Sequence, residues 1–156
     1  MSTASASSQG RRRVLQGASA FALITCLPAR AADGDLPTIP ALTKFLAGRT
    51  PRRERIRLDL PRLADNGFAV PMRISVAGPF APGPFVRTIA IFSELNPVPD
   101  LAVFEIPLPL ERIEIDSRIR LAGTQQVVVI AELTDGNLLA TAAEIVVTLA
   151  GCMDGT

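Results

Sequence analysis

Residues 126–149, QVVVIAELTDGNLLATAAEIVVTL, decide the fold of this chain. The segment VVVI is apolar at both alternating positions of a strand, so we expect this strand in the middle of a sheet with both faces covered. Asp135-Gly136 follows as a turn signal, and AAEIVVTL then has the pattern of a second strand. The stretch therefore predicts two consecutive strands joined by a tight turn.

Shorter alternating segments precede this pair, separated by turn residues such as Asp65-Asn66-Gly67 and by the proline-rich loop 78–85. They are IRLDL (56–60), VPMRISVAG (70–78), VRTIAIFSEL (86–95), LAVFEI (101–106) and RIEIDSRIRL (112–121). No helical pattern lies between them, which argues against a parallel α/β fold. The sequence therefore predicts an all-β domain, an antiparallel β-sandwich of about seven strands.

One helical pattern precedes the strands, in LPTIPALTKFLAG (36–48). Its apolar residues have helical spacing, and they are Ile39, Leu42, Phe45 and Leu46. Gly48 closes the run. We expect a short amphipathic helix near 37–47 that packs on the domain or on a partner.

The composition of the 156 residues excludes several functional classes. The chain is 48% hydrophobic and 20% charged, as expected for a single globular domain. It has no histidine, which removes the usual general base, the usual partner of a nucleophilic serine or cysteine, and the commonest metal ligand. It also has no tyrosine or tryptophan to stack on a base or a sugar. We therefore expect neither a self-sufficient enzyme nor a nucleic-acid-binding protein.

The N-terminal segment has the features of an export signal. Arg11-Arg12, with Leu15 shortly after, fits the twin-arginine pattern, and a modest apolar run follows to about residue 27. Ala29-Arg30-Ala31 is a small-x-small cleavage site, and the apolar run is too short for a membrane span. We expect residues 1–31 to be a twin-arginine signal peptide and the mature protein to be periplasmic. A general secretory signal is the alternative, and it leads to the same compartment.

Removal of this signal leaves Cys152 as the single cysteine, because Cys26 lies inside it. Cys26 faintly resembles a lipidation site, but it follows Thr25 where a small residue is expected. An odd cysteine in an exported protein indicates either pairing between chains or a free reactive thiol.

The last strand is expected to end near residue 149, so that residues 150–156, AGCMDGT, form a flexible tail. Gly151 and Gly155 lack Cβ atoms and leave the backbone free to bend. Cys152 would then be an exposed thiol that can enter the active site of another protein. A Cu(I) site formed by Cys152 and Met153 is an alternative with only two soft ligands.

Glu111, Glu114 and Asp116 are the carboxylates that come closest to an acid–base pattern. In a strand, Glu114 and Asp116 share one face and alternate with isoleucines. This pattern predicts a solvated outer face, so we assign no catalytic residue and no metal site.

The chain resembles the SoxY family, which supplies the cysteine-bearing subunit of the SoxYZ sulfur carrier. The resemblance spans residues 36–152, and its markers are ADNGFAVPMRISV (64–76), IAIFSELNPVPDLAVFEI (89–106), SRIRLAGTQQVVVIAELTDGN (117–137) and VVTLAGC (146–152). It implies an immunoglobulin-like sandwich that pairs with SoxZ and has neither catalytic activity nor a cofactor of its own.

The resemblance also implies a role for Cys152 as the covalent attachment site for sulfur. A haem-containing partner enzyme would join thiosulfate to Cys152 oxidatively, and a separate hydrolase would release sulfate. The supporting residues of the tail would be Gly151, Met153 and Gly155.

The tail departs from the family ending Gly-Gly-Cys-Gly-Gly at Ala150, Met153 and Asp154. Met153 is expected to stiffen the tail, and the negative charge of Asp154 is expected to raise the pKa of Cys152 and weaken its loading with sulfur. A diverged sandwich that acts as an assembly or regulatory partner, without carrying sulfur, is therefore the alternative from another functional class.

Overall fold

The computed structural model describes residue 1 and residues 35–78 and 82–151. The predicted signal peptide, apart from residue 1, and residues 152–156 of the predicted tail lie outside these described residues. No helix in the described part of the chain is long and apolar enough to cross a membrane.

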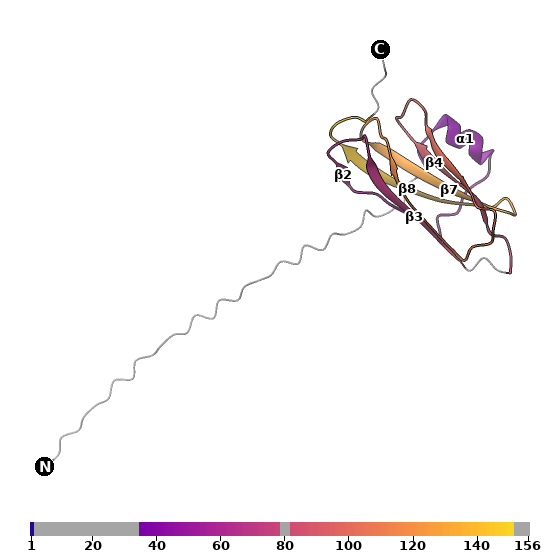
Figure 1. The fold of residues 1–156 in the computed structure, drawn as a ribbon, viewed down its shortest axis with the longest axis horizontal. Coiled ribbons are helices and arrows are strands. Elements are labelled where there is room, and N and C mark those ends of the chain that lie inside the picture. Colours follow the sequence, from indigo (N-terminus) through magenta and orange to yellow (C-terminus); the bar gives the residue numbers. More distant parts are fainter. Residues whose placement is uncertain (2–34, 79–81, 152–156) are drawn as a thin grey trace.

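In the described residues, eight strands form two sheets, with one helix outside the larger sheet (Figure 1). The smaller sheet has the order β1-β3-β6, built from β1 (Ile56–Asp59), β3 (Val70–Ala77) and β6 (Arg112–Ile119). The larger has the order β2-β8-β7-β4-β5, built from β2 (Leu63–Ala64), β8 (Leu138–Val147), β7 (Gln125–Leu133), β4 (Val86–Ser93) and β5 (Asp100–Glu105). The predicted all-β sandwich is confirmed.

Strand β2 is the one strand that the sequence pattern does not predict. It has two residues, and it pairs with β8 in parallel, Leu63 with Val146 and Ala64 with Val147. All other strand pairs are antiparallel. Two residues cannot show an alternating pattern, and the partner strand is distant in sequence, so only the tertiary structure reveals this pairing.

Strand β7 lies between β8 and β4 in the larger sheet, as its apolar pattern predicts. On one face, Val127 and Val129 pack in the core between the two sheets. On the other face, Val128 and Ile130 pack in a second cluster beneath helix α1 (Pro40–Leu46). Because both faces are covered there, the middle of the strand needs no polar side chains, and its residues 127–131 are all apolar.

Helix α1 covers the face of the larger sheet that points away from the smaller sheet (Figure 1). Pro40 lies in its first turn, where the missing backbone N–H of proline is tolerated, and Ala47 ends the helix with a left-handed φ of 49°. Leu42 is buried, and Phe45 packs edge-to-face on Phe92 with 5.5 Å between ring centroids. The predicted helix is confirmed, and it packs on the domain itself.

The outer face of the smaller sheet carries charged side chains, which confirms the predicted solvated face. Glu114 and Asp116 are exposed. Asp116 accepts a hydrogen bond from Arg73 at 2.6 Å, which raises the pKa of the Arg73 guanidinium, and Glu114 pairs with Arg112. Each of these carboxylates therefore has a cationic partner, as in an ordinary solvated sheet.

Glu132 on β7 joins the segment after α1 to the larger sheet. Arg49 donates a hydrogen bond to Glu132 at 2.7 Å, and Arg87 on β4 forms a second ion pair with Glu132 at 3.2 Å. The Glu132 side chain is 14% exposed. The hydrogen bond from Arg49 is the main cause that lowers the pKa of Glu132 below its usual value.

We expect Glu132→Gln to lower the free energy of unfolding by about 1 kcal/mol at neutral pH, because both arginines lose an ionised partner. Since the folded-state pKa is lowered, the carboxylate stabilises the fold above its unfolded pKa of about 4.3, and this contribution is lost as the pH falls through the folded value. Urea unfolding should therefore show a difference from wild type that shrinks in acid. The exposed control Glu114→Gln should stay within about 0.5 kcal/mol, and equal effects of the two variants would contradict this assignment.

Candidate functional site

The chain leaves the sandwich at the end of β8, beside the segment that contains β2. The Val146 N–H donates to the Arg62 carbonyl at 3.0 Å, and the Thr148 N–H donates to the Ala64 carbonyl at 3.1 Å. The Thr148 hydroxyl donates to the carbonyl of Asp65 at 2.6 Å. These bonds continue the parallel pairing beyond both strands, so the chain approaching the C-terminus is held to the segment approaching Gly67.

Three backbone segments meet immediately before Cys152. The Gly67 N–H donates to the Leu149 carbonyl at 2.7 Å, and the Leu121 N–H donates to the Gly67 carbonyl at 2.8 Å. The Gly151 N–H donates to the Leu121 carbonyl at 2.8 Å, and Gly151 is buried. We call the contact of Gly67, Leu121 and Gly151 the glycine clamp.

Both glycines of the clamp are required by the space available. A Cβ at Gly67 would lie far inside van der Waals distance of the Leu121 carbonyl oxygen and 2.7 Å from the Gly151 nitrogen. A Cβ at Gly151 would overlap the Gly67 carbonyl and lie 2.6 Å from the Phe68 nitrogen. Neither glycine has a left-handed φ. The backbones can touch only because neither residue has a side chain.

The structure differs from the sequence expectation at Gly151. The sequence predicts a flexible tail from residue 150, in which Gly151 leaves the backbone free to bend. Gly151 is instead buried, hydrogen-bonded and packed against Gly67. It therefore anchors the tail, and the predicted tail loses its first two residues to the folded domain.

Asn96 holds the loop that contains Leu121. Its Nδ2 donates to the Arg120 carbonyl at 2.8 Å, and its Oδ1 accepts from the Ala122 N–H at 2.8 Å. The side chain of Gln125, 3% exposed, donates to the same Oδ1 at 3.1 Å. The bonds lie on both sides of Leu121, so they fix the carbonyl that receives the Gly151 N–H.

Two large exposed apolar side chains and an arginine come from the segments that form the clamp. Phe68 is 51% exposed and Leu149 is 59% exposed, although both are large hydrophobic residues. The guanidinium carbon of Arg120 lies 6.0 Å from the centroid of the Phe68 ring, within the range of a cation–π contact. We call Phe68, Leu149 and Arg120 the rim.

Among the site residues predicted from the sequence, the structure describes Gly151. Cys152, Met153 and Gly155 lie outside the described residues. The covalent chain nevertheless places the Cα of Cys152 about 3.8 Å from that of Gly151. Within residues 35–78 and 82–151, no group of three or more histidine, cysteine, aspartate or glutamate residues could hold a metal ion.

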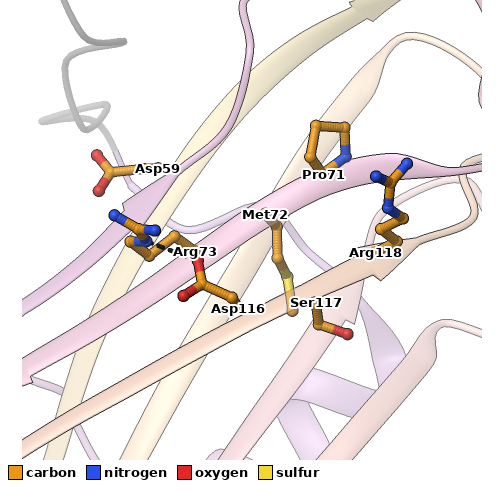
Figure 2. A pocket seen from close by; sticks show the side chains of 7 residues that line it. All are labelled: Asp59, Pro71, Met72, Arg73, Asp116, Ser117 and Arg118. Carbon is orange, nitrogen blue, oxygen red and sulfur yellow. Dashed lines mark hydrogen bonds and ion pairs between the residues drawn. The ribbon is translucent and has the colours of Figure 1, made fainter.

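A pocket of about 510 Å³ lies on the smaller sheet (Figure 2). Its lining residues come from β1, β3 and β6, and they are Asp59, Pro71, Met72, Arg73, Asp116, Ser117 and Arg118. The guanidinium of Arg73 faces Asp116 and is already paired with it (Figure 2). Because its central charges satisfy each other, this pocket gives no indication of a substrate.

Comparison with known proteins identifies the family to which this chain is similar. The family model described as "Sulfur oxidation protein SoxY" matches residues 42–152, a range that contains the whole clamp and ends on Cys152. The solved structure of the sulfur carrier protein SoxY from Chlorobium limicola f thiosulfatophilum is 30% identical in sequence. It aligns with a TM-score of 0.56 over 70% of this chain and 94% of that chain. No curated protein matches the chain.

A more distant structural likeness concerns the fold alone. The crystal structure of a putative superoxide reductase from Thermotoga maritima is 12% identical, with a TM-score of 0.50 over 60% of this chain and 87% of that chain. The SoxY match differs in kind, because it covers most of the sequence as well as the fold. The chain therefore belongs to the SoxY family of sulfur oxidation proteins.

Proposed function

We propose that this chain is a sulfur carrier that holds thiosulfate-derived sulfur on Cys152 and presents it to partner enzymes. The observation that carries the proposal is the SoxY match over residues 42–152, which includes the cysteine itself. The Chlorobium structure, named a sulfur carrier protein, supports the same role. We further propose that the chain acts in the periplasm after twin-arginine export, as a heterodimer with a SoxZ-like subunit.

In this proposal the chain supplies the nucleophile and its partners supply the catalysis. A haem-containing enzyme removes two electrons and joins the Cys152 thiolate to the outer sulfur of thiosulfate through a new S–S bond. A hydrolase then uses water to cleave the bond between the two thiosulfate sulfurs. Sulfate and two protons are released, and a persulfide stays on Cys152. The carrier itself needs no general base, in agreement with a chain that has no histidine.

Intact mass measurement of the mature protein from thiosulfate-grown cells tests this function. We expect an adduct of sulfur or thiosulfate mass that maps to Cys152 and disappears after reduction. The same spectrum reports cleavage after Ala31 and shows whether Cys26 carries a lipid. A bare thiol during active thiosulfate oxidation would contradict the carrier role and favour the non-carrier alternative.

Asp154 provides a prediction about the chemistry of the tail. Its carboxylate lies two residues after the thiol in sequence, and like charge disfavours a thiolate. We expect Asp154→Gly to shift the pH profile of Cys152 alkylation to lower pH, with a smaller shift in high salt. The exposed carboxylate variant Glu111→Gln should leave the profile unchanged. An identical profile for Asp154→Gly and wild type would show that this charge does not affect the thiol.

A further inference from the structure

We propose that the glycine clamp fixes the root of the Cys152 arm, so that partner enzymes meet the thiol at one place on the sandwich. The inference rests on the proposed carrier function and adds positioning residues to it, foremost Gly67. It differs from a swinging tail, in which every glycine near the cysteine increases the reach of the thiol. Here Gly151 limits that reach.

The position of Gly151 determines how far the thiol can travel. Gly151 is the residue directly before Cys152, and its N–H is bonded to the Leu121 carbonyl at 2.8 Å. To swing outward, Gly151 would have to break this bond and leave its contact with Gly67, which would leave the Leu121 carbonyl without this partner. Cys152 therefore starts about 3.8 Å from a fixed point.

The other members of the clamp are themselves held in place. The side chain of Leu121 is fully buried in the core between the sheets. Asn96 bonds the backbone on both sides of Leu121, and Gln125 supports Asn96 from a buried position. A point anchored in this way transmits the rigidity of the sandwich to the root of the arm.

A short arm on a fixed root has a consequence for the partners. An enzyme that receives the Cys152 sulfur must bring its active site close to the clamp, and so must contact the surrounding surface. That surface includes the rim, where Phe68 and Leu149 expose apolar side chains and Arg120 adds a positive charge. Apolar anchors beside an arginine are typical of protein–protein contacts.

Gly67→Ala tests the clamp without altering the arm itself. The new Cβ would overlap the Leu121 carbonyl and approach the Gly151 nitrogen, so the bonded pair of Leu121 and Gly151 must separate from Gly67 by roughly 1 Å. Displacements of this size can lower the rate of an aligned reaction about 100-fold. Gly123→Ala is the matched control, because a Cβ at Gly123 meets nothing within 4 Å.

Cells that oxidise thiosulfate would express wild type, Gly67→Ala, Gly123→Ala and Asn96→Ala. Intact mass gives the fraction of Cys152 that carries a reducible adduct. Iodoacetamide gives the alkylation rate of the reduced thiol, and amide hydrogen exchange gives the protection of the Gly151 N–H. Asn96→Ala loosens the same loop by a different route, so it keeps the test valid if Gly67→Ala does not fold.

We expect the early rate of adduct formation to fall about 10- to 100-fold in Gly67→Ala, and less in Asn96→Ala, with alkylation within about twofold of wild type. The Gly151 N–H should be protected from exchange in wild type and Gly123→Ala, and it should exchange faster in Gly67→Ala and Asn96→Ala. A normal rate of adduct formation in folded Gly67→Ala would overturn the proposed role of the clamp, and so would an unprotected Gly151 N–H in wild type. Absence of adduct in wild type would instead overturn the carrier function, and Gly151 exchange would then decide the clamp separately.

Discussion

Cys152→Ser is expected to abolish the reducible sulfur adduct completely, while folding and the proposed export and partner binding stay unchanged. A serine oxygen is close in size to the thiol, but it cannot form the S–S bond on which loading depends. The sequence predicts that Cys152 lies on the C-terminal tail and not in the core, so we expect the melting temperature to be unchanged. Intact mass and thermal unfolding of the purified mature protein measure both expectations.

Substitutions of Cys152 separate the carrier from its two alternatives. A non-carrier assembly partner would still support thiosulfate-dependent activity with Cys152→Ser, whereas the carrier would not. A Cu(I) delivery module would bind one equivalent of Cu(I) in wild type and lose it in Cys152→Ala, without any sulfur adduct. Cys26→Ser is the control for processing, since the proposed cleavage after Ala31 would yield a mature protein of unchanged mass.

The sandwich can be predicted from the sequence because each of its longer strands has an apolar pattern within a short stretch of residues. VVVI is apolar at both strand phases, and β7 indeed lies between two strands with both faces covered. Ile113 is buried between exposed Arg112 and Glu114, as alternation on a half-solvated strand requires. The helical spacing of residues 39–46 likewise predicts α1, because it forms one apolar stripe, and this stripe packs on the larger sheet.

The clamp could not be predicted in the same way, because it joins segments far apart in sequence. Gly67 belongs to an Asp-Asn-Gly turn signal, which explains its glycine by local geometry. The actual reason is the backbone of Leu121 and Gly151 pressed against it. In the sequence, Asn96 is an ordinary loop residue after β4. Only the fold shows that its side chain bonds the backbone on both sides of Leu121. Glycines that are required by close backbone contacts leave no periodic signal.

Leu121 connects the stability of the sandwich to the geometry of the clamp, so its substitution should have the largest effect on folding. Its side chain is fully buried in the core between the two sheets, and its backbone forms hydrogen bonds with both clamp glycines. We expect Leu121→Ala to lower the free energy of unfolding by about 2–5 kcal/mol, from lost apolar burial and the cavity left behind. The urea midpoint should fall by roughly 1–3 M.

Leu108→Ala removes the same atoms from a side chain that is 63% exposed, so it should change the unfolding free energy by less than about 0.5 kcal/mol. If Leu121→Ala were no more destabilising than Leu108→Ala, the core would not extend to the clamp. A large loss of stability in Leu121→Ala, together with faster exchange of the Gly151 N–H, would show that the core does extend to the clamp. The anchor of the Cys152 arm would then derive its rigidity from the hydrophobic core, because the residue that fills the core also provides the carbonyl that holds Gly151.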